Sequence, residues 1–533
     1  MDYNYSHYYI QKNLYIIELL NSNVIQMEKL KLTNYFSEIY EKTRYPRFKV
    51  LIDGKWVKTK DSLNLISSVD ETKIAEIGSA SKGDIDFAVK SANDNKNRIR
   101  DMSAIDRIEL LNKVRREIEV HREELVDVLV RESGKTYSSA NGEINATIER
   151  LRLSMEDSNK IKGEYIPGDW SSDTTRKVAL VIREPLGVVL GISPFNYPVY
   201  TSIAKVIPAL LSGNAVIVKP PSSDPITMLM CAEIFRKCGV PRGALQVVTG
   251  SGSVAGDYLI QNENINMISF TGSTPVGKHI AQVANLKRMH MELGGKGTAI
   301  VLDDADLDLA AKECIHGSLE LAGQRCDAVS RVLVMDNIAK KFYQRIEEHI
   351  NDYKFGNPLE CRDINVGPMI NKKAAERVDS MVKDAIKNGA KLVIGGKFNN
   401  SYYEPTILED VPLPSQIANE ETFGPVVTLI RVKDDDDAIK IANQSKYGLD
   451  SSVFTNDFYR AWKIMKALQV GDVTLNGAPS HGTAYFPFGG VKDSGDGKEG
   501  VGYSIEEMTN VKTMVFNLGA KNLGKLYSGQ FKD

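Results

Sequence analysis

One cysteine stands out among the residues whose types permit chemistry. Cys326 lies in LAGQRCDAVSR, where Gly323 and Gln324 interrupt a helical pattern and Arg325 places a cation beside the thiol. A neighbouring cation or a helix start can lower a thiol pKa from about 8.5 toward neutrality, which makes the thiolate available as a nucleophile. Most free cysteines are small buried apolar side chains, so a structural thiol is the alternative.

Two polar side chains stand where predicted strands end. Glu292 lies in MELGGKG (291–297), and Asn196 lies in SPFNYP between a strand and a helix. The carboxylate is either a structural partner of Lys296 or a general base. The amide makes either a loop hydrogen bond or a hydrogen bond to a developing oxyanion. Together with Cys326, the two residues favour nucleophilic chemistry more than any one of them does alone.

The junction FTGSTPVG (270–277), between a predicted strand and a helix, is a candidate diphosphate site. Gly272 permits a tight turn, Ser273 offers a hydroxyl, and a helix amino terminus presents free amides to phosphate oxygens. An ordinary capped helix has the same pattern, so the signal is weak alone. A second junction, GSGSVAG (250–256) followed by Asp257, has one residue too many between its second and third glycines for the dinucleotide fingerprint.

A lysine and a serine follow the predicted strand in NAVIVKPPSS. Lys219 ends that strand, at the edge where open α/β sheets bind ligands, although a solvated lysine is the alternative. Three residues later stands Ser222, where an acid would bind a free ribose hydroxyl and repel a ribose phosphate. The lack of an acid leaves room for NADP, with NAD still possible.

These residues require a scaffold of parallel strands. Continuous Val/Ile runs separated by helices indicate buried parallel strands in crossover units, and hence a doubly wound α/β region. The runs are VALVI (178–182), GVVLGIS (187–193), NAVIVKP (214–220), LQVVTG (245–250), MISFTGS (267–273) and TAIVL (298–302). A second series reaches about residue 500, with a helix at 305–321 and strands at 331–335 and 389–395. The sequence therefore predicts at least two α/β domains.

Other segments differ from this alternation. A helical stretch begins at Ser103, where Asp106 completes a capping box, and Gly134 is its predicted stop. The segments 165–185 and 508–518 are extended and fit the alternating scheme poorly. They could pair as a small sheet that also serves subunit contact.

Length and charge bound the class of protein. The chain has 533 residues, 67 Lys+Arg against 69 Asp+Glu, a net charge of −2 and a pI of about 6.5. This balance gives no broad electrostatic footprint for nucleic acid but is compatible with a small anionic substrate. With 42% hydrophobic and 26% charged residues, the composition is that of a globular chain of two or three domains.

Cysteine usage indicates the compartment. Five cysteines, without CxxC pairs or metal-ligand spacing, fit a reducing intracellular environment and predict no metal site. No apolar run reaches the roughly 18 residues of a membrane span and no signal peptide is recognisable, so we expect a cytoplasmic protein that binds neither membrane nor nucleic acid. Residues 1–26, rich in Tyr, Ile and Asn, are either a docking arm or an over-extended start.

Seven motifs resemble, in order and approximate spacing, those of the aldehyde dehydrogenase superfamily. They are ISPFNYP (192–198), VKPPS (218–222), FTGSTPVG (270–277), MELGGKG (291–297), GQRC (323–326), EETFGPV (420–426) and FPFGGVKDSG (486–495). The resemblance covers the chain from about Lys49 onward. Within the superfamily, PFNYP, KPP, GQRC and GYSIEEMT are most similar to the non-phosphorylating glyceraldehyde-3-phosphate dehydrogenases.

The resemblance implies an aldehyde dehydrogenase-like α/β fold in several parts. These are an N-terminal extension (1–45), a doubly wound parallel-sheet cofactor domain (46–164 and 186–296), a small β oligomerisation arm (165–185 and 506–522) and an α/β catalytic domain (297–505). The resemblance also implies a homo-oligomer, either a dimer or a tetramer.

The resemblance further implies a role for each candidate residue. The Cys326 thiolate attacks the aldehyde carbon, the Asn196 amide and the Cys326 backbone N–H hold the oxyanion, and a hydride leaves for the nicotinamide. Glu292 then activates water to hydrolyse the thioester. The implied cofactor contacts are Glu421 at the nicotinamide ribose, Phe423 beside the ring, and Lys219, Ser222, Asp257, Ser273 and the backbone around Ser193 at the adenosine and diphosphate.

The implied substrate contacts are less complete. Arg325 matches an arginine that faces the substrate phosphate in this subfamily, and Tyr197 matches a neighbouring contact. A second arginine is replaced by His481; a third falls near Ala146, where Arg150 lies one helical turn away on the same face. Histidine lacks the bidentate geometry of arginine. Glyceraldehyde 3-phosphate is therefore the first expectation, and glyceraldehyde, lactaldehyde or succinate semialdehyde the alternative.

Two other functions compete with hydrolytic oxidation. An acylating dehydrogenase would pass the thioester to coenzyme A, but such relatives generally lack the glutamate present here as Glu292. A non-catalytic scaffold would require none of Cys326, Glu292 and Asn196. The sequence therefore favours an NADP-preferring, hydrolytic aldehyde dehydrogenase.

Overall fold

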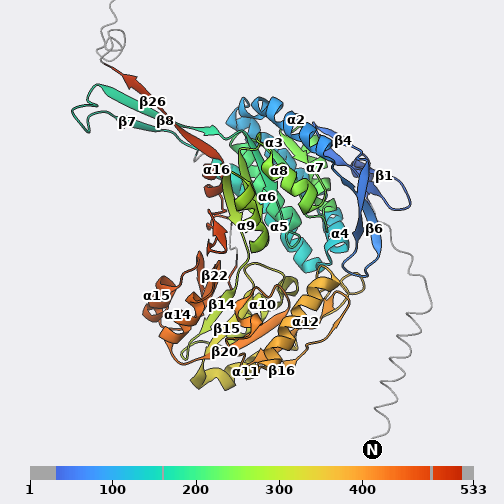
Figure 1. Ribbon diagram of the computed structural model, residues 1–533, viewed down its shortest axis with the longest axis vertical. Helices are drawn as coiled ribbons and strands as arrows, with labels where there is room; N and C mark the ends of the chain where they lie inside the picture. The colour runs from blue at the N-terminus through green and yellow to red at the C-terminus, as the bar shows by residue number, and fades with distance from the viewer. Residues whose placement is uncertain (1–29, 31, 159–160, 481–483, 519–533) are drawn as a thin grey trace, which may run out of the picture.

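Two α/β lobes and a narrow β arm make up the molecule (Figure 1). The computed structural model describes residues 30, 32–158, 161–480 and 484–518, so the segment 1–26 and His481 lie outside the described residues. One lobe holds an eight-stranded sheet, the other a seven-stranded sheet, and the arm is a three-stranded sheet. None of the helices in the described ranges is long and apolar enough to cross a membrane.

The sheet of the first lobe has the strand order β25-β13-β12-β9-β10-β11-β3-β4. The strands are β3 (Val50–Ile52), β4 (Lys55–Val57), β9 (Val188–Ile192), β10 (Ala215–Lys219), β11 (Leu245–Val247), β12 (Met267–Thr271), β13 (Arg288–Glu292) and β25 (Gly495–Asp496). The run from β13 to β11 is parallel. The chain passes from β9 outward to β11 and then returns to β12 on the other side of β9. The loops after β9 and β12 therefore flank a topological switch point. Open α/β sheets bind ligands at such points.

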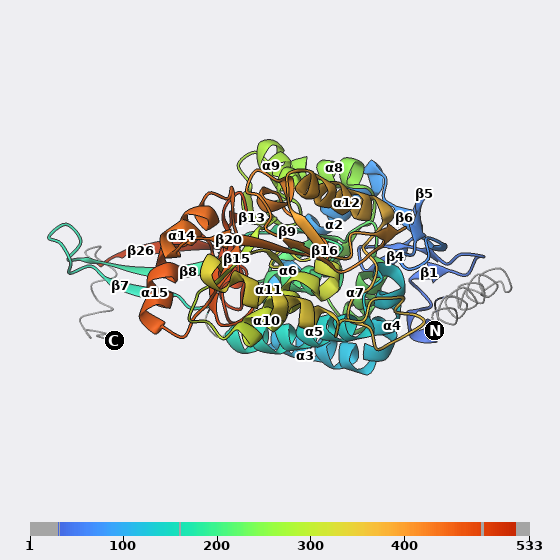
Figure 2. The ribbon, with the colours of Figure 1, turned by 90° about the horizontal axis from the view of Figure 1, so that it is seen from below.

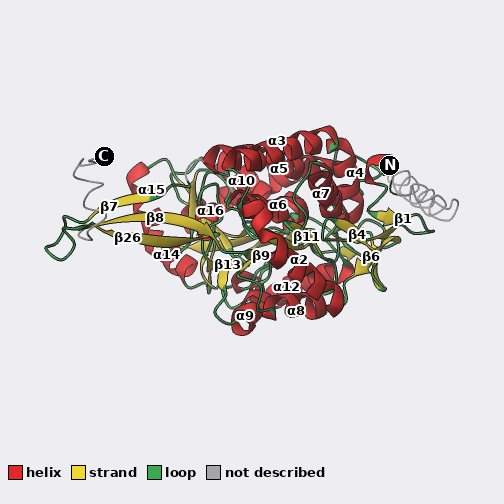
Figure 3. Ribbon diagram, turned by 90° about the horizontal axis from the view of Figure 1, so that it is seen from above, coloured by secondary structure: helices red, strands yellow, loops and turns green. Residues whose placement is uncertain are grey.

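Helices cover both faces of this sheet (Figure 3). Val188 and Leu190 of β9 pack with α2 (Lys82–Arg100), α8 (Asp257–Gln261) and α9 (Thr274–Val283). Val189 faces the opposite layer, which consists of α3 (Ala104–Val120), α4 (Arg122–Ser133), α5 (Tyr137–Asp157), α6 (Pro198–Leu211) and α7 (Ile226–Lys237). A strand covered on both faces needs apolar residues at consecutive positions, which is why the Val/Ile runs predicted these strands correctly.

The second lobe repeats the layered design around a separate core. Its sheet has the order β16-β19-β20-β15-β14-β22-β23, and only the edge pair of β16 with β19 is antiparallel among its described strands. The strands are β14 (Gly297–Val301), β15 (Val329–Met335), β16 (Lys391–Ile394), β19 (Thr406–Glu409), β20 (Val426–Val432), β22 (Asp450–Phe454) and β23 (Asp472–Leu475). Helices α10 (Leu307–Leu319), α11 (Asp336–Ile350), α12 (Lys372–Lys387), α14 (Asp435–Asn443) and α15 (Phe458–Ala467) surround them.

The arm corrects one strand prediction and confirms another. The run at 178–182 belongs to β8 (Lys177–Pro185), which lies in the arm and not in a parallel sheet. There β8 pairs antiparallel with both β7 (Glu164–Pro167) and β26 (Thr509–Asn517), so the two extended segments do form a small sheet. This sheet projects away from the body (Figures 1 and 2). The prediction for this run was wrong because the half-exposed strand β8 contains as much valine as a buried strand does.

Capping groups fix the helix boundaries as expected. Ser103 accepts a hydrogen bond from the Asp106 amide at 3.1 Å and starts α3. Gly134 ends α4 with φ 75°, a left-handed conformation that glycine adopts without strain. A short 3-10 turn, η4 (Glu320–Gly323), follows α10 and contains Leu321 at φ 52° and Ala322 at φ 53°. These left-handed residues break the helix and turn the chain toward the candidate nucleophile.

Candidate active site

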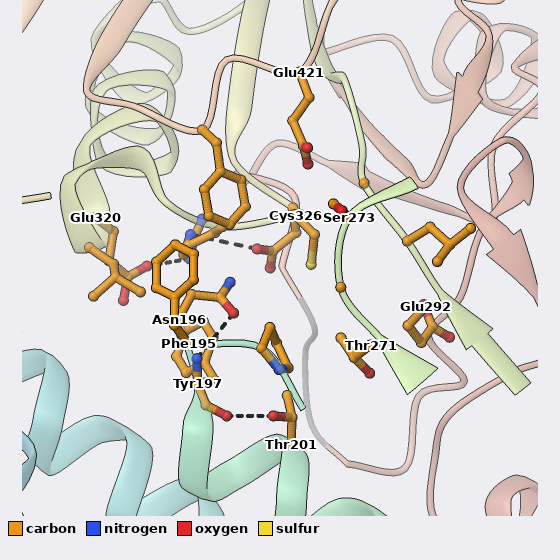
Figure 4. Close-up of a pocket in the computed structure, with 18 of the residues that line it drawn as sticks. Phe195, Asn196, Tyr197, Thr201, Thr271, Ser273, Glu292, Glu320, Cys326 and Glu421 are labelled. Atoms are coloured by element: carbon orange, nitrogen blue, oxygen red, sulfur yellow. Dashed lines mark hydrogen bonds and ion pairs between the residues drawn. The ribbon is translucent and has the colours of Figure 1, made fainter. Parts of the chain in front are cut away.

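One cavity collects most of the predicted site residues. It has a volume of about 1510 Å³ and lies beside the carboxyl ends of the parallel strands of the first lobe, where η4 and the segment around Glu421 approach from the second lobe. The predicted residues in its wall are Ser193, Asn196, Tyr197, Ser273, Glu292, Arg325, Cys326, Glu421 and Phe423. Figure 4 shows the Cys326 sulfur, the Asn196 amide and the Glu292 carboxylate around this space. Side chains from both lobes therefore meet in one place.

Close backbone packing places Cys326 opposite the loop after Glu292. A Cβ at Gly295 would overlap the carbonyl oxygen of Cys326, and a Cβ at Gly294 would lie 2.8 Å from Oε1 of Glu421. Only glycine fits such contacts, because it has no Cβ. The two glycines of MELGGKG thus let the loop, the nucleophile segment and Glu421 converge.

The pKa of the Cys326 thiol departs from the sequence-based expectation. Burial raises this pKa well above its ordinary value, and the carboxylates of Asp327, Asp450, Glu292 and Glu421 raise it further. The neighbouring cation does not compensate, because the Arg325 guanidinium is paired with a carboxylate of its own. These effects are opposite in direction to the lowered thiol pKa that the sequence predicted.

Asn196 is held at the start of α6 with its amide group free to donate. Its Oδ1 accepts the Tyr197 backbone N–H at 3.1 Å, so its Nδ2 is the group left for a ligand in the cavity (Figure 4). The helix start is pinned by Glu143, whose Oε1 accepts the Val199 amide at 2.8 Å and the Tyr200 amide at 3.0 Å. This arrangement can hydrogen-bond a developing oxyanion.

The anchor of α6 is itself a buried ion pair that sequence reasoning missed. Lys135 Nζ lies 2.7 Å from Glu143 Oε2 and 4.1 Å from the centre of the Tyr197 ring. Both side chains are almost fully buried, at 1% and 0% exposure. Neither residue lies in a recognisable motif, so the sequence offered no signal for this support.

Glu292 ends β13, as the sequence predicted. Backbone pairing with Thr271 of β12 and Gly495 of β25 fixes its position from both sides. Burial raises the pKa of its carboxyl to about 7, while the neighbouring His290 opposes that rise. A carboxyl with such a pKa exchanges protons near neutrality, as a general base must.

A lysine and a glutamate behind Glu292 were also missed. Lys205 of α6 donates from Nζ to Thr271 Oγ1 at 2.7 Å and lies 3.5 Å from Glu499 Oε2. Thr271 and Glu499 both line the cavity. A lone lysine within the apolar helix PVYTSIAKVIPALL is the signal that could have identified this group.

The junction after β12 fits a phosphate group. Gly272 and Ser273 line the cavity, and among the described residues the Ser273 side chain makes no capping bond to α9. The amide of Val276 and the helix dipole thus stay available to an anion at the first turn of this ten-residue helix. The Ser273 hydroxyl and the amides of this first turn are the donors that could hold the diphosphate of a dinucleotide.

The remaining predicted adenosine contacts lie just outside the wall. Lys219 ends β10 as expected; burial lowers the pKa of its ammonium to about 8, and Nζ donates to the Pro220 carbonyl at 3.4 Å. Ser222 is exposed and donates to the Gly250 carbonyl at 2.8 Å. Asp257 lies 3.0 Å from Nε2 of His279 on α9. Among the described residues none of the three lines the cavity, although Pro221 and Ser223 beside Ser222 do.

The expected nicotinamide end is formed by the loop 420–423. Glu421 Oε1 accepts the Gly295 amide at 3.2 Å, and burial raises the pKa of its carboxyl. Phe423 has φ 48°, a strained value for a residue with a Cβ, and packs edge-on against Phe195 with ring centres 5.7 Å apart. Both side chains therefore have fixed positions in the cavity wall.

The substrate end carries one buried arginine with carboxylates beside it. Nη1 of Arg325 donates to Glu320, and Nε lies 3.6 Å from Asp327. Nη2 is buried and makes no hydrogen bond within the described part of the chain. Tyr197 lines the same cavity. An anionic group in the cavity could satisfy the orphaned Nη2.

Arg150, the candidate substitute for a missing arginine, lies behind the wall. Its guanidinium interacts with Tyr200, which lines the cavity, and Nη2 donates to Ser504 Oγ at 3.4 Å. Its side chain is 1% exposed and is not part of the described lining. Arg150 thus supports Tyr200.

The raised thiol pKa predicts slow alkylation of Cys326 near neutrality. In a Cys361→Ser background, which removes the exposed thiol, the rate of labelling by iodoacetamide should still climb above about pH 9. Asp327→Asn, which removes one neighbouring carboxylate, should move the curve to lower pH. Peptide mass spectrometry measures the label, and a plateau below about pH 8 in the parent would contradict the raised pKa.

The comparisons with known proteins agree with this geometry. The Aldehyde dehydrogenase family profile matches residues 56–514. An NADP-dependent glyceraldehyde-3-phosphate dehydrogenase from Streptococcus equinus is 41% identical over 473 residues, covering 89% of this chain and 99% of that protein. A 3-sulfolactaldehyde dehydrogenase from Priestia aryabhattai is 37% identical over 477 residues, covering 89% and 99%.

A solved structure confirms the expected fold. The NADP complex of the NADP-dependent glyceraldehyde-3-phosphate dehydrogenase from Bacillus halodurans C-125 superposes with a TM-score of 0.86 at 38% identity, over 88% of this chain and 99% of that one. Fold, family profile and cavity agree with the resemblance that the seven motifs indicated. The chain therefore belongs to the aldehyde dehydrogenase family.

Proposed function

We propose that the chain oxidises a small aldehyde bearing an anionic group to the corresponding acid, with NADP as the preferred cofactor and glyceraldehyde 3-phosphate as the first substrate candidate. The observation that carries this proposal is the meeting of Cys326, Asn196 and Glu292 in one cavity that also includes Ser273 at the start of α9. A thiol, an amide donor and a carboxyl of pKa about 7 are the groups needed for covalent oxidation and hydrolysis.

Cys326 begins the reaction. Its thiol proton must leave to solvent through the cavity before the sulfur attacks, because burial and the nearby carboxylates raise the thiol pKa. The new S–C bond turns the carbonyl oxygen into an oxyanion, which accepts hydrogen bonds from Asn196 Nδ2 and from the Cys326 backbone N–H.

The dinucleotide would lie between the start of α9 and the loop 420–423. Ser273 and the first turn of α9 would hold the diphosphate, and Glu421 and Phe423 would hold the nicotinamide end. A bound nicotinamide would supply a hydride acceptor for the substrate carbon, and loss of that hydride converts the Cys326 adduct into a thioester. The lack of an acid at Ser222 and the NADP dependence named for two similar proteins support NADP over NAD.

Glu292 completes the cycle on the resulting thioester. Its carboxylate takes a proton from water while the water oxygen attacks the thioester carbon. The bond between the Cys326 sulfur and the acyl carbon then breaks, which releases the carboxylic acid, and the proton on Glu292 can return to the Cys326 thiolate. No added phosphate is consumed.

The anionic substrate class rests on Arg325. Arg325 lies in the cavity wall beside Tyr197, with which its guanidinium interacts, and its Nη2 makes no hydrogen bond of standard geometry among the described residues. The similar proteins are named for a phosphorylated and a sulfonated aldehyde, which share a terminal anion. One observation favours the alternative substrates glyceraldehyde, lactaldehyde and succinate semialdehyde. Glu320 and Asp327 already neutralise the charge of Arg325, so this arginine would add less binding free energy for a doubly charged substrate.

Assembly and location stay predictions. We propose that the arm of β7, β8 and β26 joins subunits of a dimer or tetramer, because it projects from the body and exposes Tyr165, Val511 and Val515. A cytoplasmic location is proposed from the sparse cysteines. The domain boundaries at 164, 185, 296 and 505 likewise stay predictions.

Replacing the hydrolytic base tests the proposed reaction. Glu292→Gln should release one equivalent of reduced cofactor per site in a burst and then stop, because the thioester forms but is not hydrolysed. Stopped-flow absorbance at the reduced-nicotinamide band measures both phases. The burst itself is the folding control, and full steady turnover would show that another group hydrolyses the thioester.

Shortening the arginine tests the substrate class. Arg325→Ala should lower kcat/KM for glyceraldehyde 3-phosphate by about 10- to 100-fold, the value of one charged hydrogen bond of 1.5–3 kcal/mol. The uncharged analogue glyceraldehyde, assayed with the same variant, is the control and should lose far less. Equal losses for the two aldehydes would assign Arg325 a structural role.

A further inference from the structure

The strand that carries Glu292 has one polar face. Residues at alternate positions of a strand point to the same side, so Arg288, His290 and Glu292 share one face of β13. Met289 and Met291, on the other face, pack in the core beneath α2, α8 and α9. The polar face turns toward the segment that leads into the arm.

His290 lies between two carboxylates. Its Nε2 is 3.4 Å from Glu292 Oε1, and its Nδ1 is 2.5 Å from Glu507 Oε2. The His290 residue is 3% exposed. A neutral imidazole has one N–H and one lone pair, so one of the two carboxylates would face a lone pair; only the imidazolium donates at both nitrogens. Within the described part of the chain neither Nε2 of His290 nor an oxygen of Glu292 makes a hydrogen bond, so the 3.4 Å contact is an ion pair, and the charged ring is the form that attracts both carboxylates.

Glu507 has a fixed position of its own. It ends α16 (Tyr503–Glu507), and its Oε1 accepts the Lys498 backbone N–H at 3.0 Å. Arg288 donates to the Glu507 carbonyl at 2.8 Å and to the Thr509 carbonyl at 2.7 Å, which ties β13 to the start of β26. A carboxylate held in this way can keep the imidazolium in place.

We propose that His290, held as an imidazolium by Glu507, is the positioning residue that keeps the buried Glu292 carboxylate ionised and aligned for hydrolysis of the thioester. This inference rests on the proposed role of Glu292. Without a cation, a carboxylate in this site would prefer to be protonated and could not accept a proton from water. Sequence similarity alone gave His290 no role.

The pKa values agree with the geometry. Burial opposes the charged form of His290, but the Glu292 and Glu507 carboxylates outweigh it and raise the imidazole pKa to about 10. Burial raises the Glu292 pKa to about 7, and His290 lowers it relative to burial alone. The ionised base is the active form and is lost as pH falls, so removal of His290 must move that loss to higher pH.

The other charged groups around the pair come from three segments. Glu292 also faces Glu499, which raises its pKa, and Lys205 of α6, which lowers it. Lys498 lies between β25 and α16, with its Nζ 3.6 Å from Asp472. Arg288, on the strand itself, is occupied by the carbonyls after α16. Lys205 is engaged by Thr271 and Glu499, so among the described residues His290 is the cation in contact with Glu292.

The test compares the pH profile of steady turnover with the burst of reduced cofactor. His290→Gln should move the acid limb of kcat to higher pH by at least about one unit, which is a tenfold loss of rate on that limb. Turnover should recover at about pH 9, where Glu292 ionises without help, and the burst amplitude should stay that of the parent. Glu507→Gln should shift the limb in the same direction by less, because His290 loses one of its two partners.

Two further variants separate the possible causes. Arg288→Gln removes a cation from the same face of β13 that touches neither carboxylate oxygen of Glu292; it should lower stability without moving the limb. Glu292→Gln should give a burst and no turnover at any pH; turnover in that variant would remove Glu292, and this inference with it, from hydrolysis, whereas the lack of any burst would overturn the proposed function.

The outcomes are decisive in each case. An unmoved acid limb in His290→Gln, or a loss of rate that alkaline pH does not restore, would overturn the role of His290. If His290→Gln fails to fold, Glu507→Gln decides alone: it is a partly exposed position, and a profile identical to that of the parent would refute the proposal.

Discussion

The burial of ionisable groups governs how this site works. The thiol of Cys326 and the carboxyls of Glu292 and Glu421 line one cavity between the lobes, and burial raises the pKa of each. A charge in such a place persists only with a partner or hydrogen bonds. Whatever binds or ionises beside these groups therefore changes their pKa values and their reactivity.

Buried charged pairs stabilise the ionised side chains around the site. Lys135 supports Glu143 under the oxyanion donor, Lys205 and Glu499 stand behind Thr271, and His290 bridges Glu292 and Glu507. Lys205–Glu499 and His290–Glu507 join segments more than 200 residues apart, whereas Lys135 pairs with the nearby Glu143, which in turn accepts the amides that start α6. Such pairs add little net stability compared with apolar packing, but removal of one member leaves a buried charge. Their value here lies in geometry and ionisation.

Local signals made much of the fold and the reacting residues predictable. Buried parallel strands have apolar residues at consecutive positions, which located β9, β10, β11 and β12. Ser103 and Gly134 marked helix ends because capping chemistry is local. The run at 178–182 failed because composition does not tell a buried strand from an arm strand.

The pKa values of the site residues could not be predicted from such local signals. The motif GQRC suggested an activated thiol, yet Asp450, Glu421 and Glu292 reach it from distant positions and reverse the expected pKa shift. Likewise, His290 and Glu507 are 217 residues apart in the chain. Contacts of this kind depend on how the two lobes and the arm segment pack together. A short stretch of sequence gives no information about that packing.

The central claim is a covalent bond between Cys326 and the substrate carbon. The most direct measurement is peptide mass spectrometry of the Glu292→Gln protein, quenched in acid after mixing with NADP and glyceraldehyde 3-phosphate. The account predicts the mass of the acyl group on the peptide that contains Cys326 and unmodified peptides for Cys314 and Cys361. Cofactor reduction with Cys326 unmodified, or an acyl group on another residue, would contradict it.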